Sequence, residues 1–125
     1  MILYQSRILR IDLKANPSVL YVFGDNLAGQ GFGGQAKEMR DEPNAIGIPT
    51  KRGPHVYFRD HDFDDAIAGM RNPLAVIELH LRNGGVIVFP ADGIGTGLAN
   101  LSAQSPRIWT YLNAKLLELG IRNHG

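Results

Sequence analysis

Short continuous runs of apolar residues recur along the chain and predict buried strands. Residues 20–23, 45–48 and 86–89 form three such runs, and each is followed by a glycine or a proline. Runs of this length with these boundaries are typical of strands buried on both faces of a sheet. Residues 8–11 show strand-like alternation, so we also expect a leading edge strand within residues 1–13.

Apolar residues at helical spacing predict helices between these strands. Residues 35–40 consist mainly of types that favour helix. Residues 73–82 begin at Asn72-Pro73, a capping residue followed by a proline at the first helical position. Ser105-Pro106 repeats this signature before residues 106–119. The apolar stripes of these two later helices consist of Leu74, Ile77 and Leu81, and of Ile108, Leu112, Leu116 and Leu119.

The segment between the second and third apolar runs is the least regular. We expect a short strand at residues 56–58 and a weak helix at residues 63–70. Residues 55–65 are rich in histidine and aspartate, which are metal-ligating types, but without a defined spacing they favour a polar loop over a metal site. Residues 121–125 leave room for only a short piece of strand.

Strands that alternate with helices predict an α/β fold. Such chains form a mostly parallel sheet with right-handed crossovers, so that helices cover both faces. The length of 125 residues suits a single domain, residues 1–125, with one core.

The composition narrows the partners that this protein could bind. A formal net charge of +1 gives no electrostatic basis for general nucleic-acid binding, so a small ligand is the better expectation. The absence of cysteine excludes disulfides and thiolate metal sites. No apolar run approaches the length of a membrane span, and residues 5–7 interrupt the apolar core that a signal peptide needs. We therefore expect a cytoplasmic protein without membrane contact.

Three segments directly after predicted strands contain the candidate binding residues. The first glycine loop (residues 29–34) follows the strand at residues 20–23, and the second glycine loop (residues 91–98) follows the strand at residues 86–89. Thr50-Lys51-Arg52 follows the strand between them. The carboxyl ends of parallel strands meet at one edge, where ligands of such sheets bind. Bare glycine backbone before a helix also suits a phosphate or another anion.

Two common nucleotide-binding motifs fit this arrangement poorly. Gly29, Gly31 and Gly34 satisfy the dinucleotide pattern G-x-G-x-x-G, but five residues separate the strand from Gly29. The next strand ends at Pro49-Thr50, where that pattern needs an acidic residue for the ribose. A P-loop is excluded because the chain contains no Gly-Lys-Ser or Gly-Lys-Thr sequence.

An ordered set of motifs between residues 19 and 119 resembles the macro domain family. Within that family, the set is most similar to the compact macro-like proteins of phages and bacteria and to the terminal ADP-ribose glycohydrolase branch. It implies a three-layer fold with a mostly parallel mixed sheet, in a bacterial or phage-infected cell. The motifs are Gly24-Asp25-Asn26-Leu27, Gly31-Phe32-Gly33-Gly34-Gln35-Ala36, Ile48-Pro49-Thr50-Lys51, Pro90, Gly93-Ile94-Gly95-Thr96-Gly97-Leu98 and Trp109.

The resemblance implies binding of ADP-ribose or a related nucleotide, with no cofactor and no metal. Asn26 would bind the distal ribose, although an asparagine here is equally typical of a turn. Asp25 would contact the adenine side, and the second glycine loop would offer N–H groups to the phosphates. The candidate ligand-binding residues are Asp25, Asn26, Gly33, Gly34, Gln35, Gly95, Thr96, Gly97 and Leu98.

The resemblance also implies a chemical role for Lys51. In the glycohydrolases a lysine at this position attacks the distal ribose, and such a lysine must be neutral, which requires burial or a nearby cation such as Arg52. The acidic residue that those enzymes place after Gly-x-Gly-Leu is Ala99 here, and Asp92, Asp25 and His55 are candidates to replace it. Two hypotheses follow: an ADP-ribosyl hydrolase with Lys51 as nucleophile, or a non-catalytic module that binds a nucleotide or a partner.

Overall fold

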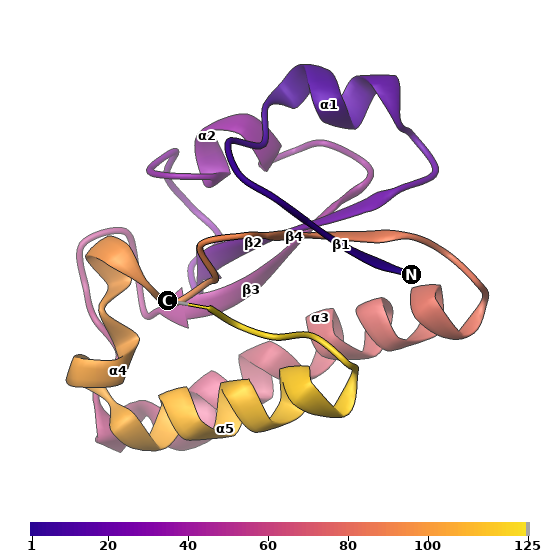
Figure 1. The fold of residues 1–125 in the computed structure, drawn as a ribbon. Coiled ribbons are helices and arrows are strands. Elements are labelled where there is room, and N and C mark those ends of the chain that lie inside the picture. Colours follow the sequence, from indigo (N-terminus) through magenta and orange to yellow (C-terminus); the bar gives the residue numbers. More distant parts are fainter. Residues whose placement is uncertain (125) are drawn as a thin grey trace.

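A parallel sheet divides the protein into three layers (Figure 1). The computed structural model describes residues 1–124. Within them the chain forms strands and helices in alternation, as the sequence predicts. The elements are β1 (Ile2–Gln5), α1 (Arg10–Ala15), β2 (Leu20–Asn26), α2 (Ala36–Met39), β3 (Ala45–Lys51), η1 (Asp60–Asp62), α3 (Phe63–Arg82), β4 (Ile87–Pro90), η2 (Gly97–Ala99), α4 (Leu101–Gln104) and α5 (Pro106–Glu118).

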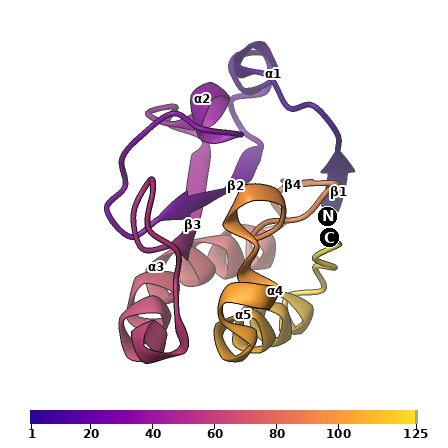
Figure 2. The same cartoon turned by 90° about the vertical axis from the view of Figure 1, so that its left-hand side faces the viewer.

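The strands lie in the order β1-β4-β2-β3, and every pair is parallel. The two central strands carry the continuous apolar runs, and all four residues of β4 are buried. Because all strands run in the same direction, their carboxyl ends meet at one edge of the sheet. That edge faces the viewer in Figure 2, where the loops around α2 and α4 gather.

Helices cover both faces of the sheet, which confirms the predicted α/β class. α3 and α5 lie together under one face, while the shorter α1 and α2 lie on the other (Figure 1). The larger core cluster lies with α3 and α5 and includes Met70, Ile77 and Leu112. The smaller cluster lies with α1 and α2 and includes Leu13 and Met39. The apolar stripe of α5 faces the core as expected, and Ser105 accepts a hydrogen bond from the backbone N–H of Ile108.

The leading edge strand expected within residues 1–13 is confirmed as β1, but the alternation at residues 8–11 does not mark a strand, because this segment leads into α1. The Asp12 carboxylate accepts a hydrogen bond from the backbone N–H of Leu9, at 2.9 Å, and so caps the first helical turn. Leu13 is fully buried, whereas Ile11 is 70% exposed. The alternation of apolar residues therefore reflects a short helix that buries one side, and the leading strand is only Ile2–Gln5.

A single long helix replaces the two helices expected between residues 63 and 82. Pro73 lies inside α3 and does not begin a new helix. Ala66, Met70, Pro73 and Ile77 are all buried on one stripe. This continuous burial against the sheet outweighs the missing hydrogen bond of the proline.

Two expected short strands are absent from the part of the chain that the structure describes. Residues 56–58 belong to a tight loop, in which the N–H groups of Arg52 and Gly53 both donate to the carbonyl of Val56. Residues 121–124 form no strand, and Gly125 lies outside the described residues.

Candidate functional site

The carboxyl ends of all four strands open into one cleft of about 400 Å³. The residues that line it come from the segments after β1, β2, β3 and β4, whereas the sequence pointed to three of these four. The structure thus brings together every residue predicted to bind a ligand or to react. These residues are Asp25, Asn26, Gly33, Gly34, Gln35, Lys51, Asp92, Gly95, Thr96, Gly97 and Leu98.

The second glycine loop is held in shape by a residue far along the chain. The Asn123 side chain accepts a hydrogen bond from the N–H of Ile94, at 2.7 Å, and donates one to its carbonyl, at 3.0 Å. The Thr96 hydroxyl donates to the carbonyl of Asp92, at 3.1 Å. Within residues 1–124 the backbone N–H groups of Gly95 and Thr96 donate to no protein acceptor. They are therefore free to bind an anion in the cleft.

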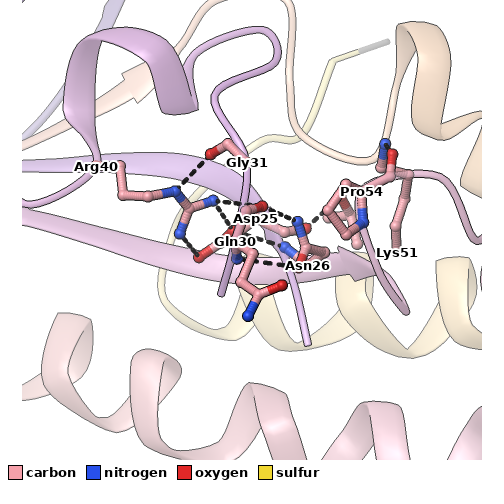
Figure 3. Close-up of polar contacts among 8 residues, drawn as sticks. Asp25, Asn26, Gln30, Gly31, Arg40, Lys51 and Pro54 are labelled. Carbon is pink, nitrogen blue, oxygen red and sulfur yellow. Dashed lines mark hydrogen bonds and ion pairs between the residues drawn. The ribbon is translucent and has the colours of Figure 1, made fainter. Parts of the chain in front are cut away.

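The first glycine loop is hydrogen-bonded to the protein at Gln30, whereas the space around its last glycines, Gly33 and Gly34, is open. Asn26 is buried and binds Gln30 twice: its Nδ2 donates to the Gln30 carbonyl, at 2.8 Å, and its Oδ1 accepts from the Gln30 N–H, at 3.4 Å (Figure 3). A Cβ atom added at Gly33 or Gly34 would meet nothing within 4 Å. Among the described residues, the N–H groups of these two glycines have no acceptor.

Asp25 forms a largely buried ion pair, so its carboxylate is not free in the cleft. Both terminal nitrogens of Arg40 donate to it, at 2.5 and 3.1 Å, and the exposed fractions of the two side chains are 14% and 11% (Figure 3). The Asp25 carboxylate also accepts from the N–H of Asn26, at 2.8 Å. Arg40 Nε in turn donates to the Gly31 carbonyl, at 2.7 Å. In this arrangement Asp25 positions Arg40, which anchors the first glycine loop.

Lys51 and Arg52 point to different sides of the chain, as expected for neighbours on an extended segment. The Lys51 Nζ lines the cleft and donates to the carbonyl of Pro54, at 2.8 Å (Figure 3). Arg52 does not line the cleft, and its guanidinium pairs with Asp62 and Asp65, at 2.9 and 3.1 Å. Arg52 is therefore not the cation that would hold the Lys51 amine neutral.

Three further residues of the cleft, Asp92, Ala99 and Gln35, differ in exposure and in the hydrogen bonds that they make. Asp92 is exposed, and within residues 1–124 its carboxylate forms no ion pair or hydrogen bond. Ala99 lines the cleft but offers no proton. Gln35 carries a buried side-chain oxygen, Oε1, which has no hydrogen-bond donor in the described part of the chain. A buried acceptor of this kind is costly unless a ligand or water donates to it.

The polar segment at residues 55–65 serves mainly structural contacts. The described residues contain no group of three or more His, Asp or Glu side chains placed to hold a metal ion. Asp62 and Asp65 bind Arg52, and the Asp60 carboxylate accepts from the Ser105 hydroxyl, at 2.5 Å. His55 is the member of this segment that lines the cleft. Residues 60–62 form η1 and residues 63–65 begin α3, so of the expected polar loop only residues 55–59 are irregular.

Two charged cleft residues were missed by sequence reasoning for different reasons. Arg7 lines the cleft after β1, but the leading strand was expected only somewhere within residues 1–13, so the position of its end was not predicted. The pattern of Ile2, Leu3 and Tyr4 followed by polar residues was the signal that could have located this end. Arg40 lines the cleft only because α2 carries it back toward Asp25, and no local pattern marks that pairing.

Comparison with known sequences and structures gives a family but no function. The chain belongs to a family of unknown function, DUF7831, which matches residues 3–115. No curated protein and no solved structure matches it. In the described part of the chain, none of the helices combines the length and the apolar character needed to cross a membrane.

Proposed function

We propose that the cleft binds ADP-ribose or a related nucleotide. The observation that carries this proposal is the set of unpartnered N–H groups on the second glycine loop, at Gly95 and Thr96, within residues 1–124. Asn123 holds the adjacent Ile94 at two atoms, so these donors need little reorganisation before they bind. Successive backbone N–H groups in a fixed turn form a concave site that suits a phosphate.

The position and size of the cleft support a nucleotide as the ligand. Ligands of parallel α/β sheets bind beyond the carboxyl ends of the strands. A volume of about 400 Å³ lies within the range of about 300–1,000 Å³ typical of small-molecule sites. The choice of ADP-ribose among nucleotides rests on the resemblance to macro domains. We also propose the cytoplasmic location that the sequence predicts.

Hydrolysis of the bound ligand is a second candidate, favoured because Lys51 and Asp92 line the same cleft. Three features argue against efficient turnover. The Lys51 ammonium is engaged with the carbonyl of Pro54, and Arg52 is turned away. Ala99 stands where the resembling enzymes carry an acid. We therefore expect binding without turnover, and a module for another nucleotide or a partner protein is the remaining alternative.

Isothermal titration with ADP-ribose, AMP and NAD tests the proposal. We expect saturable one-to-one binding of ADP-ribose. Gly33 is the best position to block the cleft, because its backbone is not left-handed and a Cβ there meets nothing within 4 Å. Gly33→Glu adds a negative charge and should weaken binding at least tenfold, whereas Gly33→Gln adds the same bulk without the charge and should weaken it less. Gly34 is less suitable, since its φ of +57° strains any side chain.

Two outcomes would change the assignment. No heat and no thermal shift with any of the three ligands at millimolar concentration would contradict nucleotide binding. Release of ADP-ribose from an ADP-ribosylated protein, lost in Lys51→Ala with binding retained, would establish the hydrolase instead of the binder.

A further inference from the structure

We propose that Arg7 and the second glycine loop form one anion subsite, in which Arg7 supplies the positive charge for a phosphate group. This inference deepens the proposed function and rests on it for the identity of the complete ligand. It assigns a binding role to the segment after β1, which neither the sequence motifs nor the family places in the site. The argument depends on position, on charge and on backbone conformation.

The strands place Arg7 next to the second glycine loop. Gln5 at the end of β1 is the register partner of Pro90 at the end of β4. The pairing continues one residue further, because the N–H of Ala91 donates to the Gln5 carbonyl, at 3.0 Å. The two chains therefore leave the sheet side by side, and both Arg7 and the loop line the same cleft.

Arg7 is the cation beside the second glycine loop whose side chain is not paired with another group of the described residues. Arginine and lysine residues line it at Arg7, Arg40 and Lys51. Arg40 is paired with Asp25, while Lys51 binds the Pro54 carbonyl and belongs to β3, two strands away from β4, or about 10 Å across a sheet. Within residues 1–124 the Arg7 guanidinium has no ion pair and no hydrogen bond. Arg7 follows β1, which pairs directly with β4, the strand that leads into the loop.

The charge of Arg7 is needed here because the second glycine loop also carries Asp92. This exposed carboxylate lines the same cleft and repels an anion. Backbone N–H groups contribute only partial charges, so a full positive charge beside them makes this end attractive to a phosphate. A guanidinium suits this task because it can donate two parallel hydrogen bonds to phosphate oxygens.

The backbone of Arg7 is strained, which a turn alone does not explain. Its φ is 50°, in the left-handed region, where a residue with a Cβ atom is disfavoured by about 1–2 kcal/mol relative to the right-handed form. Glycine or asparagine would make the turn between β1 and α1 at lower cost. An arginine in such a conformation at the edge of a cleft indicates a role for its side chain.

Two variants separate binding from structural effects. Arg7→Gln removes the charge, and Arg7→Gly removes the charge and the strain together. Both should weaken binding of AMP and of inorganic pyrophosphate about tenfold, as expected for one charge-assisted contact to a phosphate. Both should leave binding of uncharged adenosine within twofold of wild type. Arg7→Gly should also raise the urea midpoint of unfolding, so affinity and stability move in opposite directions.

Titration calorimetry with adenosine, AMP, pyrophosphate and ADP-ribose measures these effects. Arg71→Gln is the matched control, because Arg71 is an exposed arginine of α3 that does not line the cleft. Its affinities should equal those of wild type. Unchanged binding of AMP and pyrophosphate in Arg7→Gln would overturn the subsite even if ADP-ribose binds. Wild-type binding of pyrophosphate that depends on Arg7, without binding of ADP-ribose, would support the subsite and contradict the proposed function. Binding of neither would overturn both.

Discussion

The two glycine loops both contain glycines with positive φ, but they differ in the space around those glycines. In the second loop space is restricted as well: a Cβ at Gly93 would lie 1.9 Å from the carbonyl oxygen of His124, and one at Gly95 would crowd Leu101 and Trp109 at 3.2–3.3 Å. In the first loop the requirement is conformational, because a Cβ at Gly29 or Gly34 would meet nothing within 4 Å.

This difference indicates different roles in binding. The second glycine loop is packed against the rest of the protein and clamped by Asn123, so its N–H groups are already arranged for a ligand. The first glycine loop is fastened at Gln30 and Gly31 and exposed at Phe32, Gly33 and Gly34. It has room to adjust around whatever occupies the cleft. We therefore expect changes in the second loop to affect affinity through shape, and changes in the first to act mainly through its anchors.

The largest expected effect comes from releasing the anchor of the first loop. Arg40→Leu leaves the Asp25 carboxylate largely buried without its partner, which should lower the free energy of unfolding by about 3 kcal/mol. Urea denaturation measures the loss. The double variant Asp25→Asn with Arg40→Leu removes the unpaired charge and should recover part of it. A loss below about 1 kcal/mol in the single variant would show that this pair does not hold the loop.

An intermediate loss of stability is expected when the hydrogen bonds between Asn123 and Ile94 in the second glycine loop are removed. Asn123→Ala removes both partners of the Ile94 backbone, whose side chain is buried, and should cost about 2 kcal/mol. It should also weaken ADP-ribose binding, because the N–H groups of Gly95 and Thr96 lose their fixed arrangement. Asn113→Ala is the control, since Asn113 makes one bond, to a carbonyl within α5. Equal affinities in the two variants would mean that the Asn123 hydrogen bonds to Ile94 do not order the second glycine loop for binding.

The smallest effect distinguishes two adjacent glycines of the first loop. Gly34→Ala places a Cβ at a φ of +57° and should lower the free energy of unfolding by about 1 kcal/mol. Gly33→Ala, without a positive φ and with open space around it, should change it by less than about 0.5 kcal/mol. Thermal or urea unfolding of both variants gives the difference. Equal stabilities would indicate that the first loop relaxes freely around either substitution.

Local pattern was sufficient for the elements that carry continuous apolar runs. The strands β2, β3 and β4 lie where the runs predict them, and α5 begins at Pro106 after its serine cap. Because the carboxyl ends of parallel strands meet at one edge, the same pattern also brought Lys51 and both glycine loops to a single cleft. These features depend on neighbours in the sequence and on the geometry common to all parallel sheets.

Local pattern failed where a distant contact or a buried face decides the structure. The proline of α3 was expected to start a helix, but burial of Met70, Pro73 and Ile77 against the sheet continues the helix through it. The segment at residues 8–11 has the alternation of a strand, and the cap at Asp12 together with burial of Leu13 makes it helical. Because the pattern did not locate the end of the leading strand, Arg7, which follows β1, was not recognised as a cleft residue.

The sequence by itself determined the α/β class, the edge of the sheet where the cleft lies and most of the residues that line it. Only the tertiary structure decided which of their polar groups are hydrogen-bonded or ion-paired within the protein and which remain available to a ligand. Asp25 is bound by Arg40 across 15 residues, and Ile94 is bound by Asn123 across 29. Such pairs depend on where whole helices and the C-terminal segment pack, and no local propensity encodes that position.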